Sequence, residues 1–384
     1  MKILIAVTYY HPYISGFTLH AEREARALAR RGHHVTVLAS QHEKSLPLHE
    51  ILDGVEVYRA KVLMYISKGA LMPTMFLQVL ILAKQADVVH LHLPQLDAAP
   101  IAMLLRLIKK PIVVTYHCDL SLPSGFVNYV ANRVSDLANW ITCSLADFIV
   151  HNTRDYAEHS PFLRRYLHKV VPIFPPVEPL RANDEQVEAF RQKYALTSSK
   201  PVIGMSGRLA TEKGVEYLVG AMQIVRQRYP NARVLFVGPY QNVLGEEAYA
   251  RRLAPLIERL GEHWSFLGVL PVLEQSAFFR ACDVTVLPSL NPTESYGLTQ
   301  VESMASGTPV VASDLPGVRV PVQITGMGRI VRRADAEALA QALLEVLDHP
   351  DQYRLDPADF LRKSSADYVA QEYEKVFLIA MGKK

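Results

Sequence analysis

Two glutamates, Glu294 and Glu302, flank a glycine that opens a helix-like pattern. They belong to the segment Pro-Ser-Leu-Asn-Pro-Thr-Glu-Ser-Tyr-Gly-Leu-Thr-Gln-Val-Glu, in which Gly297 separates a loop from the helix. The first amides of a helix have no partner within it and lie at the positive end of the helix dipole, so they bind anions. We expect a phosphorylated ligand on the amides of Tyr296, Gly297 and Leu298, with a carboxylate at each end for sugar hydroxyls.

A second anion-binding pattern lies upstream, between an apolar run and a helix-like pattern that begins at Val215. The loop between them, Gly-Arg-Leu-Ala-Thr-Glu-Lys-Gly, runs from Gly207 to Gly214 and carries Arg208 and Lys213. A strand, a glycine loop with two cations and a helix are typical of phosphate binding, where arginine offers a bidentate fork and lysine a point charge. We expect Arg208 and Lys213 to neutralise a diphosphate.

Neither pattern has the spacing of a common nucleotide motif. A P-loop needs a glycine before its lysine and a serine or threonine after it, where this chain has Glu212 and Gly214. The segment Tyr9–Gly16 lacks the spaced glycines of dinucleotide-binding enzymes, which disfavours a dehydrogenase. The acid spacing alone is uninformative, because Glu337 and Glu345 repeat it inside an ordinary helical pattern.

Length and composition predict a two-domain protein of a reducing compartment. The 384 residues are 49% hydrophobic and carry a net charge of +3, so the chain exceeds one core and electrostatics does not call for a nucleic-acid partner. The three cysteines, Cys118, Cys143 and Cys282, are isolated and lack metal-ligand spacing. Together with an N-terminus that does not read as a signal peptide, they predict a cytoplasmic protein with buried thiols.

Short apolar segments alternate with helix-like patterns in both halves of the chain. Alternation of this kind predicts parallel sheets covered on both faces, and hence two α/β, Rossmann-like doubly wound domains. The expected strands lie near Lys2–Tyr9, His34–Ala39, Val88–His92, Ile112–His117, Phe148–Asn152, Val202–Ser206, Arg233–Val237, Val284–Leu287 and Val310–Ser313.

A proline-rich segment, Pro-Ile-Phe-Pro-Pro-Val-Glu-Pro over 172–179, is the expected linker. The last helical pattern, over about 367–381, can pack back on the first domain. We therefore assign 1–175 with 366–384 to an N-terminal domain and 176–365 to a C-terminal domain. Doubly wound sheets bind ligands beyond the carboxyl ends of their strands, so we expect the site in a cleft between the domains.

Three histidines of the first half lie on or at the end of strands. His117 ends a strand and precedes Asp119, so it can bond to a sugar hydroxyl. His90 and His92 share one strand face by the period of two, a spacing that suits a metal ion. We nevertheless predict no metal cofactor, because no Asp-x-Asp occurs in the chain to hold a divalent ion beside a diphosphate. Cationic side chains and amides are expected to replace it.

The most apolar stretch, from Ala70 to Ala83, contains Pro73 and is shorter than the ~20 residues of a membrane-spanning helix. A buried helix is the favoured interpretation. The alternative is peripheral contact with the inner face of the cell membrane. That contact would use an apolar face near three lysines: Met72, Met75, Phe76, Leu77 and Leu80, with Lys61, Lys68 and Lys84.

In combination, these motifs resemble the retaining nucleotide-sugar glycosyltransferases of family 4, within the group 1 glycosyltransferases. The resemblance covers nearly the whole chain. It rests on Gly16, the runs Leu-Ala-Arg-Arg-Gly-His-His-Val and Asp-Val-Val-His-Leu-His, Gly207-Arg208, Lys213-Gly214, the acidic segment around Glu294 and Glu302, and Gly-Thr-Pro-Val-Val-Ala-Ser behind it. It implies the GT-B architecture, with two Rossmann-like domains facing a cleft, the acceptor mostly on the first and the donor nucleotide mostly on the second.

The resemblance also implies a role for each candidate residue. Arg208 and Lys213 would bind the donor diphosphate and stabilise the leaving group. Glu294 would meet donor-sugar hydroxyls, Glu302 the ribose, and His117 the donor sugar from the opposite domain. The base would lie near Gly268, Val269 and Leu270. The remaining donor contacts are expected at Gly16, Gly207, Ser295, Tyr296, Gly297 and Leu298, with Ser15 standing where the family often has a second glycine.

By the same resemblance the chain is expected to transfer a hexose with retention of configuration, from a UDP-sugar first and GDP-mannose next, to a saccharide or lipid-linked acceptor. A carboxylate pair separated by a diphosphate cradle does not suit glycoside hydrolysis. The chemistry would rest on charge stabilisation of the leaving group. The alternatives are a GT-B epimerase or phosphorylase, and a sugar-nucleotide-binding protein without catalysis.

Overall fold

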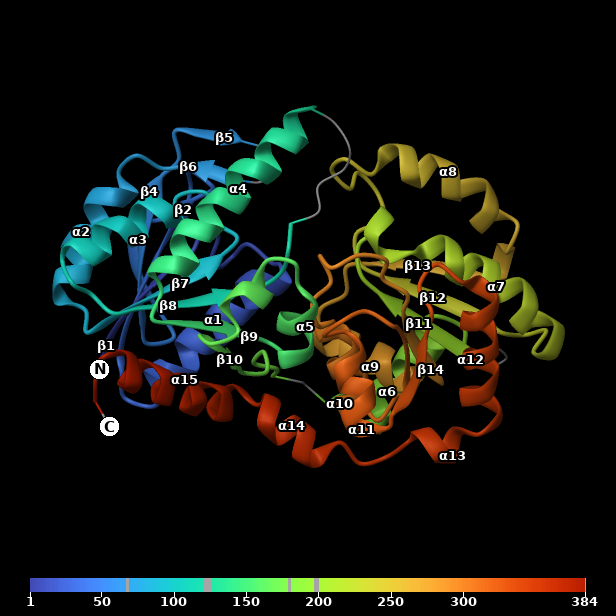
Figure 1. Cartoon of the computed structure of the whole chain (residues 1–384). Helices are drawn as coiled ribbons and strands as arrows, with labels where there is room; N and C mark the ends of the chain where they lie inside the picture. The colour runs from blue at the N-terminus through green and yellow to red at the C-terminus, as the bar shows by residue number, and fades with distance from the viewer. Residues whose placement is uncertain (67–68, 121–125, 179–180, 197–199, 384) are drawn as a thin grey trace. The chain divides into compact units, whose positions relative to one another are not determined.

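The computed structural model contains two compact units, each built on its own parallel sheet (Figure 1). It describes residues 1–66, 69–120, 126–178, 181–196 and 200–383. The first unit comprises Met1–Glu178 and Lys363–Lys384, and the second comprises Pro179–Arg362. The divisions predicted from the sequence lie after residues 175 and 365. Pro179, at the end of the predicted linker, lies outside the described residues.

The first sheet has eight strands in the order β10-β9-β8-β7-β1-β2-β4-β3. All neighbours are parallel except β3, which pairs with β4 in the antiparallel sense. A separate antiparallel pair, β5 and β6, follows β4. The strands are β1 Lys2–Ala6, β2 His34–Gln41, β3 His49–Leu52, β4 Val55–Lys61, β5 Met64–Ile66, β6 Gly69–Leu71, β7 Val88–Leu93, β8 Ile112–Tyr116, β9 Phe148–His151 and β10 Val170–Pro172.

The second sheet is parallel throughout, in the order β13-β12-β11-β14-β15-β16. Numbered along the chain this is 3-2-1-4-5-6, the strand order of a Rossmann fold. The order of the strands along the chain reverses between β11 and β14. The prediction of two Rossmann-like α/β domains is confirmed. The strands are β11 Val202–Ser206, β12 Arg233–Val237, β13 Trp264–Gly268, β14 Val284–Leu287, β15 Val310–Ser313 and β16 Gly328–Val331.

Helices connect these strands. In the first unit they are α1 Gly16–Arg30, α2 Met75–Gln85, α3 Ala98–Leu107, α4 Phe126–Leu145, α5 Arg154–His159, the 3₁₀ helix η1 Leu163–Tyr166 and α15 Ala366–Ala380. In the second unit they are α6 Asp184–Lys193, η2 Thr211–Lys213, α7 Val215–Arg228, α8 Glu247–Glu258, η3 Gly261–His263, α9 Val272–Ala281, α10 Leu298–Ala305, α11 Arg319–Thr325, α12 Ala336–Asp348 and α13 Pro350–Tyr353. Helix α14, Ala358–Ser364, crosses the division between the units.

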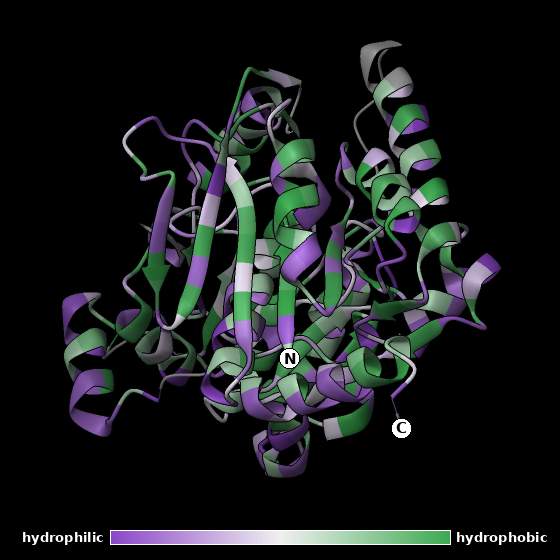
Figure 2. Cartoon of the chain, turned by 90° about the vertical axis from the view of Figure 1, so that its left-hand side faces the viewer, coloured by the Kyte–Doolittle hydropathy of each residue, from purple (hydrophilic) through white to green (hydrophobic). Residues whose placement is uncertain are grey.

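Alternation along the buried strands gives each sheet two apolar faces. In β1, Leu4 and Ala6 belong to one hydrophobic core of the first unit, whereas Ile3 and Ile5 belong to the core on the other face. The strands of this sheet are accordingly hydrophobic over much of their length (Figure 2). Helix α15, the last of the chain, packs against α1 beside the second of these cores (Figure 1), so the C-terminal segment completes the first unit.

The apolar stretch before and within α2 is part of the core. Met72 and Met75 are buried, Phe76 packs against the same core, and Leu77 is exposed. The favoured interpretation, a buried helix, agrees with this packing, and the five residues of the alternative do not form one exposed face. Lys68 lies outside the described residues. Among the helices the structure describes, none combines the length and apolar character needed to cross a bilayer.

Candidate functional site

Two loops of the second unit meet where the strand order of its sheet reverses, between β11 and β14. Strands β11 and β14 are parallel neighbours, so the loops that follow them leave the same edge of the sheet. The amide of Leu290, in the loop after β14, donates to the carbonyl of Glu212, in the loop after β11, at 2.9 Å. Ligands of such sheets bind at this edge, and both sequence patterns predicted to bind phosphate are brought together there.

A glycine makes the close contact of the two loops possible. Gly214 caps the start of α7 with φ of +64°, in the left-handed region. A Cβ atom at this position would lie 2.2 Å from the carbonyl oxygen of Pro288. A side chain is therefore excluded both by conformation and by space.

The two cations of the first loop are paired with carboxylates. Lys213 Nζ lies 2.5 Å from Glu294 Oε2, across the two loops, and Ser289 Oγ donates to the same oxygen at 3.4 Å. Arg208, which is more exposed, pairs with Glu212 at 2.7 Å within its own loop. A diphosphate would compete with these carboxylates for the cations, and Glu212 is a partner that the sequence analysis did not predict.

The N-terminus of α10 lies at the end of the second loop. Gly297 is its N-cap, with φ of +80°. The amides of Leu298 and Thr299 begin the helix and have no carbonyl partner within it, whereas the amide of Gln300 donates to the carbonyl of Gly297 at 3.1 Å. The Gln300 side chain donates to the carbonyl of Tyr296 and, at 2.9 Å, to that of Val318, which braces the turn from inside. Tyr296 is itself buried. The helix end is thus rigidly held and suited to an anion.

The remaining donor candidates of the second unit lie in the loop before α10, on α10 itself and at the end of β13. Ser295 is partly exposed in the loop before Gly297. Glu302, on α10, accepts from Gln275 of α9 at 3.4 Å. Gly268 ends β13, at the edge of the sheet, and is followed by the exposed Val269 and the buried Leu270, whose side chain is in the core. Only the backbone and Val269 can therefore offer a surface to a base at this place.

Gly16 and His117 belong to the first unit and lie at one edge of its sheet. Ser15 caps α1, with its hydroxyl accepting the Thr18 amide at 3.2 Å, so one of the orphan amides beyond Gly16 is already satisfied. The ring of Phe17, next to Gly16, contacts that of His117, with centroids 4.5 Å apart. The helix start and the end of β8 are thereby brought together.

The histidines of β7 are buried behind His117. His90 and His92 are fully buried, and His92 Nδ1 lies 2.9 Å from His117 Nε2. Burial, reinforced by neighbouring imidazoles, lowers the pKa of His20 to about 3 and holds the pKa values of His92 and His117 well below the ordinary value. Burial also lowers the pKa of His151 to about 4. With pKa values below the ordinary one, His20, His92, His117 and His151 carry no charge near pH 7.

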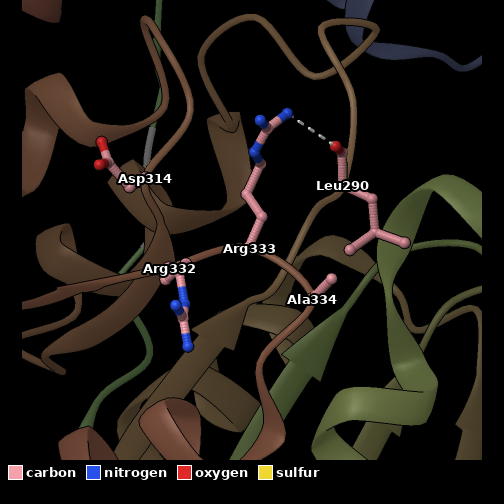
Figure 3. A pocket seen from close by; sticks show the side chains of 5 residues that line it. All are labelled: Leu290, Asp314, Arg332, Arg333 and Ala334. Atoms are coloured by element: carbon pink, nitrogen blue, oxygen red, sulfur yellow. Dashed lines mark hydrogen bonds between the residues drawn. The ribbon is translucent and has the colours of Figure 1, made fainter.

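A hollow adjoins the loop that carries Glu294 (Figure 3). Its walls come from the ends of β14, β15 and β16, and Arg333 reaches across to donate to the carbonyl of Leu290 at 3.3 Å. Leu290 is thus held through both its backbone amide and its carbonyl. This bond is not predictable from the sequence, because it joins residues 43 positions apart. The lining residues are Leu290, Asp314, Arg332, Arg333 and Ala334.

Two family models match the chain, one on each half. The model described as glycosyl transferases group 1 matches residues 186–360, and the model described as glycosyl transferase 4-like domain matches residues 15–175. The first covers the loops after β11 and β14, and the second covers the segment from Ser15 through His117.

Whole-length relatives agree with these matches. An uncharacterized glycosyltransferase of Methanocaldococcus jannaschii is 25% identical, covering 99% of this chain and 99% of its own length. A phosphatidyl-myo-inositol mannosyltransferase of Mycobacterium leprae is 27% identical, covering 98% and 96%. In fold, the chain is similar to Anabaena HepE in complex with UDP, with a TM-score of 0.75, 19% identity and coverage of 98% and 99%. The architecture is GT-B.

Replacing Gly214 with alanine should destabilise the second unit by about 2–4 kcal/mol. About 1 kcal/mol comes from the left-handed conformation, and the rest from the clash with the Pro288 carbonyl. The matched control is Gly245→Ala, since Gly245 also has a positive φ but a Cβ there meets nothing within 4 Å. Urea unfolding followed by Trp264 fluorescence, in a Trp140→Phe background, measures both. Equal losses in the two variants would contradict the close contact.

Stability should fall as the pH drops from about 7 to 5. The unfolded chain takes up protons on its histidines near pH 6.5, whereas His20 and His151 stay neutral in the folded state until about pH 3 and 4. Each group therefore costs about 2 kcal/mol of unfolding free energy at pH 5. Urea unfolding of a Trp264→Phe variant, with Trp140 as the reporter of the first unit, measures how the free energy of unfolding depends on pH. His151→Gln should make this dependence weaker. A flat profile would show that these imidazoles titrate normally.

Proposed function

The chain belongs to the group 1 glycosyltransferases, and from that premise we propose that it transfers a hexose from a nucleotide diphosphate sugar with retention of configuration. A UDP-sugar is the favoured donor and GDP-mannose the next. The proposal includes no metal cofactor. The observation that carries it is the meeting of Lys213, Glu294 and the α10 N-terminus at the reversal of the second sheet.

The proposed leaving group is the nucleoside diphosphate, bound where cations and helix amides converge. Lys213 and Arg208 offer positive charge from one loop, and the amides of Leu298 and Thr299 offer donors at the end of the other. Negative charge develops on the diphosphate as its bond to the anomeric carbon breaks. Preorganised donors stabilise that charge without reorganisation, which is the main source of catalysis in such sites.

Glu294 is proposed as a reader of donor-sugar hydroxyls. Its Oε2 is engaged by Lys213 and Ser289, so the carboxylate is oriented and its charge compensated, which suits a hydrogen-bond acceptor better than a nucleophile. The acceptor hydroxyl would then attack the anomeric carbon from the face that the diphosphate leaves. Because the new bond from the acceptor oxygen to the anomeric carbon forms on the face where the bond to the diphosphate breaks, configuration is retained. The proton of the acceptor hydroxyl passes to the departing diphosphate.

The acceptor is proposed to be a saccharide or a lipid-linked saccharide. Support for a lipid comes from the name of the mycobacterial relative and from α4 of the first unit. That helix exposes more than half of Tyr129, Leu137 and Trp140, with Arg133 beside Tyr129. Apolar side chains with a cation at helical spacing suit the surface of an anionic bilayer, so the peripheral membrane contact is assigned to this helix rather than to α2.

The test of the proposed function is an assay of diphosphate release. UDP-glucose and GDP-mannose are offered with candidate acceptors, with and without EDTA, and the product's anomeric configuration is read by NMR. Acceptor-dependent release of UDP or GDP that survives EDTA supports the proposal. Release of sugar phosphate alone would indicate a phosphorylase, a changed sugar nucleotide an epimerase, and binding without turnover a binding protein.

Removing either cation should abolish most transfer. We expect Arg208→Ala and Lys213→Ala each to lower kcat by about 100-fold or more, the cost of losing one preorganised partner of a developing negative charge. Lys193→Ala is the matched control, since Lys193 is an exposed cation of the same unit that pairs with Glu274. Steady-state kinetics with matched thermal unfolding curves decides the matter. Unchanged turnover in either variant would remove the diphosphate role.

If α4 contacts lipid, Leu137→Ser with Trp140→Ser should reduce binding to vesicles of anionic phospholipid by about tenfold or more, because two large apolar side chains no longer enter the interface. Leu244→Ser is the control, since Leu244 is an exposed leucine of the second unit. Vesicle sedimentation measures the bound fraction. Equal binding by the wild type and the double variant, or no binding at all, would leave the saccharide acceptor.

A further inference from the structure

A carboxylate is buried behind His117 without a lysine or arginine beside it. Glu24, on α1, is fully buried, and in the described part of the chain its carboxylate lies close to ring nitrogens of three histidines. Oε1 lies 2.9 Å from His90 Nδ1, and Oε2 lies 3.6 Å from His20 Nε2 and 3.8 Å from His92 Nε2. Neither oxygen has a hydrogen-bond partner among the described residues. Burying a carboxylate is costly unless protons are directed at it, so its charge favours imidazoles that turn an N–H group toward it.

His92 connects this carboxylate to His117. Its Nε2 faces Glu24, and its Nδ1 lies 2.9 Å from His117 Nε2. His117 is the more exposed ring of the pair, at 9% against 0%. The order Glu24, His92, His117 therefore runs from the core toward the edge of the sheet.

The charge of Glu24 favours one arrangement of protons on His92 and His117. Burial holds the pKa of both imidazoles well below the ordinary value, so near pH 7 each ring carries a single N–H. If His92 donates from Nε2 toward Glu24, its Nδ1 is an acceptor, and His117 must donate from Nε2. If His92 instead donated from Nδ1, its bare Nε2 would face the carboxylate, which is repulsive. The carboxylate therefore selects the tautomer of His117 in which Nδ1 is bare.

We propose that Glu24 and His92 are positioning residues that hold His117 with Nδ1 as a hydrogen-bond acceptor for a hydroxyl of the donor sugar. The sugar contact rests on the proposed function, whereas the tautomer does not. Carbonyl or carboxylate partners commonly fix the tautomer of a functional histidine from behind. In this chain an intervening histidine transmits the effect.

The second oxygen of Glu24 serves a different branch, which supplies the control. His90 Nε2 lies 2.7 Å from Thr115 Oγ1, which lies 2.8 Å from Tyr373 Oη on α15. Tyr373 Oη in turn lies 3.2 Å from His20 Nε2. This branch has no hydrogen bond to His117 among the described residues and meets it only through the ring of His20, whose centroid lies 5.0 Å from that of His117. Thr115→Val should disturb the buried network and its stability while leaving the tautomer of His117 unchanged.

A metal ion is the competing explanation of the same groups. Glu24, His90 and His92 are a possible ligand set among the described residues, with ligand atoms within 4.8 Å of one another. An ion there would occupy His92 Nε2, and the N–H directed at Glu24 would not exist. Stoichiometric zinc or another transition metal in the purified protein, measured by mass spectrometry, would overturn the proposal.

The tautomer is tested directly by nitrogen-15 NMR of histidine-labelled protein near pH 7, with the His117 signals assigned by their loss in His117→Gln. The wild type should show a bare Nδ1 and a protonated Nε2 at His117. Glu24→Gln, which keeps the shape of the side chain, should give a mixture of tautomers, and Thr115→Val should give the wild-type pattern. A protonated Nδ1 in the wild type, or no effect of Glu24→Gln, would overturn the proposal without reference to activity.

The functional half is tested with whichever donor, UDP-glucose or GDP-mannose, supports transfer. Glu24→Gln should lower kcat/KM by about threefold to tenfold, the worth of one neutral hydrogen bond. Among monodeoxy analogues of that donor, one should lower the kcat/KM of the wild type by a similar factor, because it lacks the hydroxyl that His117 binds. With that analogue, Glu24→Gln should cause no further loss of kcat/KM. Equal sensitivity of every donor would assign Glu24 a structural role only. Absence of transfer in the wild type would instead contradict the proposed function, while the NMR result would stand by itself.

Discussion

The approach of Gly214 to the carbonyl of Pro288 is the contact on which the donor-side site depends. It brings together two loops that leave adjacent strands, and the backbone bond between Leu290 and Glu212 holds them there. Lys213 can then reach Glu294 from the other loop. A larger residue at position 214 would separate the loops, and Lys213 would no longer reach Glu294.

The local elements of the second unit could be read from sequence more fully than their assembly. Strands β11, β12, β14 and β15 were predicted with the observed bounds, because each is a short apolar run that ends at a polar loop. The edge strands β13 and β16 were missed, since they are less apolar and carry glycine. The pairing of Lys213 with Glu294 was not predictable, because it joins residues 81 positions apart and depends on the reversal of strand order.

In the first unit, the strand positions of the histidines are predictable from the sequence, but the groups that surround them are not. The period of two placed His90 and His92 on one strand face, and a metal was considered on that spacing alone. The missing information was Glu24, which lies on α1 and meets those histidines only after the sheet and helix pack. For the apolar residues around α2, composition alone does not distinguish a face turned to the core from a face turned to solvent.

Both units thus place a carboxylate beside side-chain nitrogens, Glu294 in the loop before α10 and Glu24 within α1, but with different consequences. The partly buried pair of Lys213 and Glu294 in the second unit can exchange partners with a ligand, whereas the fully buried Glu24 in the first unit can only orient a neighbour. The central claim, that the second-unit loops hold a diphosphate, is tested most directly by calorimetric titration of UDP, GDP and their nucleosides. We predict that one diphosphate binds at least about 100-fold more tightly than its nucleoside, as two charge-assisted contacts would require, and that Lys213→Ala removes most of this difference. A nucleoside that binds as tightly as its diphosphate, or a difference that survives Lys213→Ala, would contradict the account.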